Sequence, residues 1–204
     1  MRKKIVVASN NKGKINEFKK ILSDLDLEVL SLKDMNIDID VEEDGITFEE
    51  NAKKKAAEIY KELINRGENN FIVISDDSGL EVDYLNGDPG VFSARYAGEH
   101  GNDKKNNEKL LYNLKGIKDE DRSARFVCQL AIINDKNEYR AIRGTVEGYI
   151  IEKEKGLEGF GYDPLFLYKP LEKTFGELSM DEKNKISHRG KALLKARNII
   201  ETLL

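Results

Sequence analysis

Five short segments of the sequence combine residue types suited to binding a phosphate group, a divalent cation or a flat ring. They are residues 9–14, 42–45, 76–79 and 159–164, and a basic cluster formed by Lys183 with residues 187–189. Each segment taken singly also fits an ordinary structural role, such as a capped helix, a solvated acidic loop, a turn or a core aromatic. Their combination indicates a nucleoside phosphate ligand bound with Mg²⁺.

The segment at residues 9–14 is the candidate phosphate site. It follows an apolar run and opens an amphipathic pattern, so we expect it at the N-terminus of a helix. Backbone N–H groups and the helix dipole favour an anion at such an end. Lys12 and Lys14 add positive charge, and Gly13 lets the backbone approach a phosphate closely. The glycine and hydroxyl spacing of a Walker A loop is missing.

Two acidic segments are candidates for metal binding and proton transfer. Asp76 and Asp77 come at the end of an apolar run, where α/β sheets gather ligands. Adjacent strand residues face opposite sides, so we expect only one of these carboxylates to reach a ligand. It would hold Mg²⁺ or take a proton from water, although a turn at Gly79 explains the segment equally well. Residues 42–45 would join a metal site only if they fold beside Asp77.

The segment at residues 159–164 is a candidate slot for a flat ring. Two glycines flank Phe160, and Tyr162 and Asp163 follow. Aromatic faces stack on nucleobases, and a carboxylate reads the edge of the ring. A tight loop with core aromatics is the alternative.

The basic cluster near the C-terminus completes the set of candidates. Arg189 is suited to bidentate contacts with phosphate, and His188 to donating a hydrogen bond. Lys183 and Ser187 are four residues apart and share a face if one continuous helix carries both.

The elements that must position these segments alternate between strand and helix patterns in the first half of the chain. Apolar runs predict strands at residues 4–8 and 71–74, and a weaker one at 27–32. Helical spacing predicts helices over residues 12–24, 48–66, 102–114 and 192–203, with a capping pattern at 47–50 and another at 179–182. Residues 122–133 and 138–151 read as two long strands joined by a turn. The order predicts an α/β protein with a mixed sheet.

Composition limits the classes of protein that this chain can belong to. Its 204 residues are 39% hydrophobic and 35% charged, with a net charge of -4, which excludes a strongly basic nucleic-acid binder. The single cysteine, Cys128, lies in an apolar run and is expected to be a small buried hydrophobe. Apolar runs are too short for a membrane span or a signal peptide. We therefore expect a cytoplasmic protein that binds neither nucleic acid nor membranes.

Six segments of the chain, in order, resemble the inosine triphosphate pyrophosphatase family, also called non-standard purine NTP pyrophosphatases or dITP/XTP diphosphatases. The segments are residues 9–14, 47–52, 76–80, 89–96, 159–164 and 187–190. The resemblance implies Mg²⁺-dependent hydrolysis of ITP, dITP and XTP to the nucleoside monophosphate and pyrophosphate. It also implies an elongated mixed β-sheet with flanking helices and two lobes with an active-site cleft between them. We expect residues 1–204 to form this single domain, and the protein to be a homodimer.

The resemblance also assigns roles to individual residues. Asp77 matches the family's proton acceptor and a metal ligand. Glu42 matches the second metal ligand, with Glu43 as the alternative because this region aligns less cleanly. The residues that match substrate contacts are Ser9, Asn10, Asn11, Lys12, Gly13, Lys14, Ser78, Phe160, Gly161, Tyr162, Asp163, Lys183, His188 and Arg189.

Two other functions fit the same residues. One is a pyrophosphatase of the same architecture that acts on pyrimidine or methylated nucleotides. The other is a nucleotide-binding or sensing module without catalysis, which would have no need of a carboxylate base beside the phosphates. Assays of pyrophosphate release distinguish both from the hydrolysis of deaminated purine nucleotides.

Overall fold

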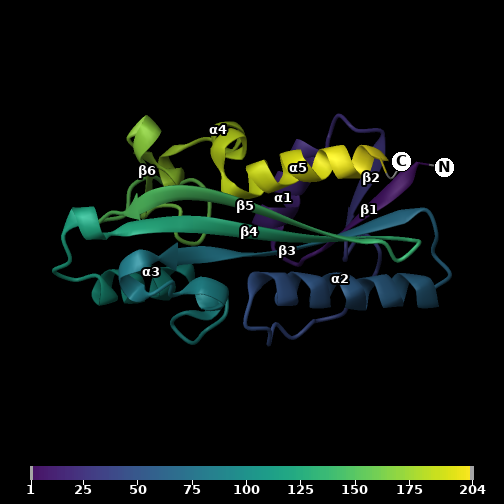
Figure 1. Cartoon of the computed structure of the whole chain (residues 1–204), viewed down its shortest axis with the longest axis horizontal. Helices are drawn as coiled ribbons and strands as arrows, with labels where there is room; N and C mark the ends of the chain where they lie inside the picture. Colours follow the sequence, from purple (N-terminus) through teal and green to yellow (C-terminus); the bar gives the residue numbers. More distant parts are fainter. Residues whose placement is uncertain (1, 203–204) are drawn as a thin grey trace. The chain divides into compact units, whose positions relative to one another are not determined.

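One mixed sheet carries the fold in the computed structural model, which describes residues 2–202 (Figure 1). Over those residues the sheet has seven strands in the order β2-β1-β3-β4-β5-β6-β7. The strands are β1 (Lys3–Ala8), β2 (Leu27–Ser31), β3 (Phe71–Val82), β4 (Ser123–Asn134), β5 (Tyr139–Ile150), β6 (Phe166–Tyr168) and β7 (Lys173–Thr174). β1 runs parallel to β2 and β3, and β6 antiparallel to β5 and β7, which confirms the predicted mixed α/β class.

Five α-helices accompany these strands within the described residues. They are α1 (Lys12–Ile21), α2 (Phe48–Asn65), α3 (Asp103–Asn113), α4 (Met180–Ile186) and α5 (His188–Thr202). Over residues 2–202, none of them has both the length and the apolar character that crossing a bilayer requires.

The chain divides into two compact units. The first contains the described residues up to Asp77, Cys128–Gly144 and the residues from Gly190 onward. The second contains Ser78–Val127 and Thr145–Arg189.

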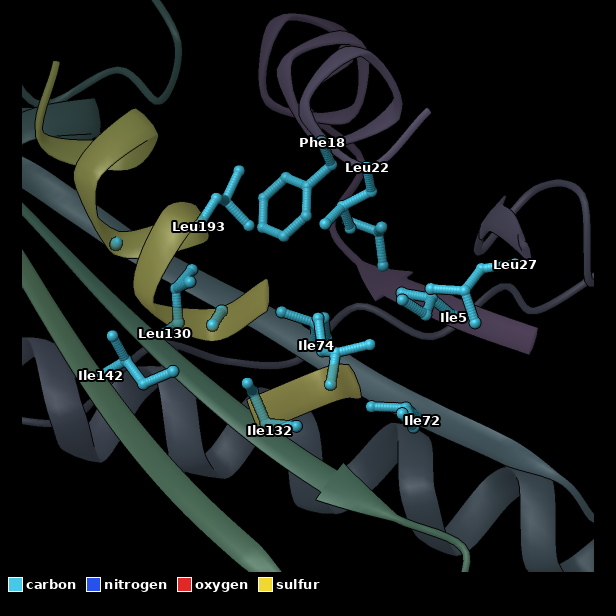
Figure 2. Packing of buried hydrophobic residues seen from close by; sticks show 14 of the residues in the cluster. Ile5, Phe18, Leu22, Leu27, Ile72, Ile74, Leu130, Ile132, Ile142 and Leu193 are labelled. Atoms are coloured by element: carbon cyan, nitrogen blue, oxygen red, sulfur yellow. The ribbon is translucent and has the colours of Figure 1, made fainter. Parts of the chain in front are cut away.

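The first unit has an apolar core on each face of its strands. Even-numbered residues of β3, such as Ile72 and Ile74, pack with α1 and α5, whereas odd-numbered ones, such as Val73, pack with α2. Figure 2 shows the first of these cores, with Phe18 of α1 and Leu193 of α5 directed at the strands. The alternation of a strand therefore sends neighbouring side chains to two different helices.

The second unit packs around a cluster of phenylalanines. The rings of Phe126, Phe166 and Phe175 lie 4.6–5.8 Å apart between centroids. Leu110 of α3 and Leu178 are buried in the same core.

The predicted helix starts at residues 12 and 48 are confirmed by their caps. Asn11 accepts a hydrogen bond from the Lys14 N–H and begins α1. Thr47 and Glu50 form a capping box that begins α2, which fixes where each side chain of that helix points.

Two sequence expectations need correction, and two short strands were not predicted. β3 does not end at residues 75–79 but continues to Val82, because Asp76 and Asp77 are hydrogen-bonded inside the unit and Leu80 and Val82 are buried. The last helix begins at His188, and the extended residue Ser187 separates it from α4, so Lys183 and Ser187 do not share a continuous helix. The short strands β6 and β7 carry too little periodicity to be predicted.

Leu22→Ala is expected to lower the free energy of unfolding by about 2–5 kcal/mol, because Leu22 is 1% exposed in the core of Figure 2 and its removal leaves a cavity. The matched control is Leu157→Ala, since Leu157 is fully exposed and should change stability by less than about 0.5 kcal/mol. Denaturant titration of both variants makes the comparison. Equal losses would contradict the packing described here.

Candidate active site

The two adjacent carboxylates of β3 lie on opposite faces of the strand, as predicted. Asp76 faces α1, where its Oδ1 lies 2.5 Å from the Lys14 Nζ and its Oδ2 accepts a hydrogen bond from the Cys128 thiol at 3.1 Å. Asp77 faces α2, where its Oδ2 accepts a hydrogen bond from Asn51 Nδ2 at 3.0 Å. Each helix thus supplies a partner to one carboxylate.

Lys55 connects the acidic loop to this strand. Its Nζ lies 2.8 Å from Glu43 Oε1 and 3.9 Å from Asp77 Oδ1, and it donates to the Asp76 carbonyl at 2.9 Å. Glu43 is therefore the acidic-loop carboxylate that Lys55 links to Asp77, whereas the Glu42 side chain is exposed. The role of Glu42 as a metal ligand stays a prediction. The contacts of Lys55 favour the alternative ligand, Glu43.

Burial dominates the electrostatics of Asp77. Desolvation raises the pKa of its carboxyl from 3.8 to about 6, and the negative charge of Glu43 acts in the same direction. The positive charges of Lys55 and Lys14 and the hydrogen bond from Asn51 oppose this rise of the pKa. A carboxyl with a pKa near neutrality is suited to exchange a proton with a bound ligand or water.

Asp77 and Glu43 fit a magnesium ion that takes only one or two ligands from the protein. Within residues 2–202, no group of three or more His, Cys, Asp or Glu side chains could hold a metal ion on its own. Mg²⁺ is commonly held by one or two carboxylates, with water and substrate phosphates completing its octahedron. Asp77 and Glu43 match that requirement, since both lie within reach of the single cation Lys55.

The candidate phosphate site lies at the N-terminus of α1. Asn11 Oδ1 caps the helix, and the Asn11 N–H in turn donates to Ser9 Oγ at 3.2 Å. Asn10 and Lys12 are exposed, and Gly13 is half-buried. Lys14 is directed at Asp76, so the positive charge of Lys14 is paired with a carboxylate of β3.

The second unit gathers several of the other predicted residues around Phe160. The Lys183 Nζ lies 4.6 Å from the centroid of the Phe160 ring, and the Arg189 Cζ lies 5.8 Å from it. Arg189 is 1% exposed and donates to Ser78 Oγ at 2.8 Å. His188 instead stacks on Phe126 in the core, with ring centroids 4.8 Å apart.

Asp163 organises the glycine-rich loop. Its Oδ2 accepts hydrogen bonds from the Phe160 N–H at 2.9 Å and from Lys183 Nζ at 2.6 Å. The Gly161 N–H donates to Asp103 Oδ2 at 2.7 Å. The loop is therefore held at three points, which fixes its backbone at Phe160 and Gly161.

Tyr162 is part of the apolar core of the second unit. The side chain is 4% exposed within the phenylalanine core, and its hydroxyl donates to the Ser93 carbonyl at 2.9 Å. Burial raises the pKa of Tyr162, which keeps this donor protonated. The substrate contact expected for Tyr162 stays a prediction.

Sequence reasoning missed three residues that surround the carboxylates: Asn51, Lys55 and Cys128. The capping box places Asn51 and Lys55 one turn apart on one face of α2, but it does not indicate that this face meets β3. Cys128 is buried, as expected, but no local pattern indicates that its thiol points at Asp76.

These features define an α/β protein with a buried carboxylate pair beside a lysine-rich helix N-terminus. The chain belongs to the Ham1 family, whose model matches residues 5–199. It is 57% identical to the dITP/XTP pyrophosphatase of Clostridium perfringens, an alignment that covers 99% of each chain. It is also 49% identical to the dITP/XTP pyrophosphatase of Bacillus subtilis over 98% of each chain.

Solved structures agree with this assignment. The Ham1 protein of Staphylococcus aureus has a TM-score of 0.85 and 46% identity, covering 99% of this chain and 100% of its own. A HAM1 protein from Coxiella burnetii has a TM-score of 0.86 and 38% identity over 98% of this chain and 99% of its own. The family expected from the six segments is confirmed.

Asp77→Asn is expected to stabilise the metal-free protein at pH 8. The pKa of this carboxyl is higher in the folded protein, about 6, than its ordinary value of 3.8, so the folded state binds the proton more tightly. The group's favourable contribution is full below pH 3.8 and is lost as pH rises through about 6. At 1.36 kcal/mol per pKa unit, the buried charge costs up to about 3 kcal/mol at pH 8. Denaturant titration with a chelator present should show that D77N has a higher free energy of unfolding than wild type, by an amount that shrinks toward pH 5.

Asp34→Asn is a control that is expected to change stability at pH 8 in the opposite direction. Hydrogen bonds from Ser31, chiefly from its backbone N–H, lower the pKa of Asp34 to about 2. Its stabilising contribution is present above pH 3.8 and is lost as pH falls through about 2, so D34N should lose stability at pH 8. A D77N protein less stable than wild type at pH 8 would contradict the burial of Asp77.

Gly159→Ala is expected to destabilise the protein more than Gly161→Ala. Both glycines have positive φ, +81° and +63°, so each substitution costs about 1–2 kcal/mol in backbone conformation. A Cβ at Gly159 would also overlap the carboxylate of Asp163, whereas nothing lies within 4 Å of a Cβ at Gly161. Thermal unfolding of the two variants should therefore give the lower Tm for G159A, and equal Tm values would show that the loop is not held by Asp163.

Proposed function

We propose that the chain is a nucleoside triphosphate diphosphatase that hydrolyses dITP, XTP and ITP to the nucleoside monophosphate and pyrophosphate. The observation that carries this proposal is the buried Asp77 carboxylate, whose pKa of about 6 suits a general base and whose Oδ1 lies 3.9 Å from the Lys55 Nζ. Support for the substrates comes from relatives such as the Clostridium perfringens dITP/XTP pyrophosphatase, at 57% identity over the full chain.

The triphosphate would bind at the N-terminus of α1. Ser9, Asn10 and Lys12 offer hydroxyl, amide and ammonium groups beside the first-turn N–H groups of the helix. Lys14 and Lys55 add positive charge from two helices. Together these groups stabilise the negative charge that develops on the phosphate oxygens during the reaction.

We propose Mg²⁺ as the cofactor, held by Asp77 and an acidic-loop glutamate. The contacts of Lys55 favour Glu43 for that second position, whereas the family resemblance assigns it to Glu42. When bound, the ion supplies charge neutralisation for the triphosphate oxygens.

Asp77 would orient a water molecule and take its proton. The water oxygen forms a bond to the α-phosphorus, and the bond from that phosphorus to the α–β bridging oxygen breaks. The electron pair leaves with pyrophosphate, while the proton passes to the Asp77 carboxylate. General-base assistance of this kind contributes about 10²–10⁴-fold to the rate.

The purine would bind at the Phe160 loop of the second unit. The ring of Phe160 provides a stacking surface, and Asp163, His188 and Arg189 provide polar groups for the base or a phosphate. Discrimination against adenine would come from donors directed at the 6-oxo group, since an adenine amino group would leave them unpaired.

Two properties of the working enzyme complete the proposal. A homodimer is the expected assembly of this family. The cytoplasm is the expected location, because a substrate drawn from the nucleotide pool is found there.

Pyrophosphate release from ITP, dITP, XTP, GTP, ATP, CTP and UTP, with and without Mg²⁺, tests the function. We expect Mg²⁺-dependent release from the inosine and xanthosine nucleotides only. Asp77→Asn should lower kcat at least about 100-fold while the protein stays folded, because it removes the base.

Other outcomes of this assay separate the alternatives. Activity on pyrimidine nucleotides would support the proposed reaction but contradict the proposed specificity for deaminated purines. Orthophosphate as the first product would overturn attack at the α-phosphorus. Binding without any release would favour a sensing module, and near-normal kcat in D77N would remove Asp77 from the mechanism.

A further inference from the structure

The side-chain amide of Asn51 is fully buried and joins two parts of the first unit. Its Nδ2 donates to Asp77 Oδ2 at 3.0 Å, and its Oδ1 accepts from the Gly45 N–H at 2.8 Å. The two partners fix which way the amide points, because the backbone N–H requires an acceptor and the carboxylate oxygen requires a donor. The side chain thus ties the acidic loop to the carboxylate of β3.

We propose that Asn51 is a positioning residue for the reaction, which sets the distance between Asp77 and the acidic loop that carries Glu43. This inference rests on the proposed function for its activity readout. Without the amide, the acidic loop would lose its hydrogen-bonded link to the Asp77 carboxylate, and the two carboxylates would no longer be held at the exact spacing that a shared cation requires.

The surroundings of Asn51 are rigid enough for this role. A Cβ at Gly45 would lie 2.7 Å from Asn51 Oδ1 and 2.8 Å from Glu50 Cβ, so the loop lies directly against the helix. The helix is in turn tied to β3, since Ser75 Oγ donates to the Ala52 carbonyl at 2.5 Å. The amide therefore bridges a loop and a strand that the helix already holds close together.

A matched control lies in the second unit. Asn106 is 2% exposed and is the fourth residue of α3, as Asn51 is the fourth residue of α2. Its Oδ1 accepts from the Ala97 N–H at 2.8 Å, and its Nδ2 donates to the Ala94 carbonyl at 3.3 Å. Asn106 therefore repeats the geometry of a buried amide bridge without any contact to the carboxylates.

The test compares N51D with N106D in the full chain. N51D keeps the acceptor for Gly45 and loses the donor to Asp77. We expect its kcat for ITP to fall about 100-fold, since misplacement of a catalytic group by about 1 Å has that effect. The KM for ITP should change less than threefold, because Asn51 is fully buried and both ends of its amide are bonded within the protein. N106D, assayed below its Tm, should keep kcat within about twofold.

Hydrogen exchange of the Gly45 amide in the metal-free protein gives a readout that does not depend on activity. The amide should be protected in wild type and in N51D, and should exchange at least about tenfold faster in N51A. A wild-type Gly45 amide that exchanges as fast as an exposed loop would overturn the inference, as would an N51D enzyme that keeps its kcat within twofold. If wild type releases no pyrophosphate at all, the proposed function fails, while the exchange data still decide whether the bridge exists.

Discussion

The burial of the Asp77 carboxylate is the constraint on which the polar architecture of the first unit depends. A charge placed inside a protein is costly unless hydrogen bonds and an opposite charge accompany it. Asn51 and Lys55 offset part of that cost from one face of α2, although desolvation still raises the pKa of Asp77. Their position depends on where the helix begins, and the Thr47 capping box sets that point. A local capping motif therefore determines the environment of a residue far away in the sequence.

The alternation of β3 extends this arrangement to the other face. Asp76 points toward α1 and contacts Lys14, while Asp77 points toward α2 and Lys55. Two negative charges on consecutive residues are thus separated by the backbone, and each has a lysine from a different helix. The N-terminus of α1, proposed to bind phosphate, and the face of α2 that carries Asn51 and Lys55 both contact this strand, which links the proposed anion site to the proposed base.

Local patterns in the sequence were sufficient for the framework and insufficient for the site contacts. Strands β1, β4 and β5, and the starts of α1 and α2, follow from periodicity and from caps within a few residues. The continuation of β3 through Asp76 and Asp77 could not be predicted from local patterns. Acidic residues normally mark a strand's end, and only partners distant in the sequence stabilise them here. Lys55 was missed for the same reason. It meets Asp76 across 21 positions of the chain, a separation that no local pattern reports.

The most direct test of this account is the pKa of Asp77 itself. Carbon-13 NMR of aspartate-labelled, metal-free protein follows each carboxyl carbon through a pH titration, and D77N identifies the signal of this residue. We predict a carboxyl that titrates near pH 6 and is absent from D77N, because desolvation of Asp77 outweighs the opposing effects of Lys55 and Asn51. An Asp77 signal that titrates near its ordinary value of 3.8 would show that the carboxylate is solvated and would contradict the account.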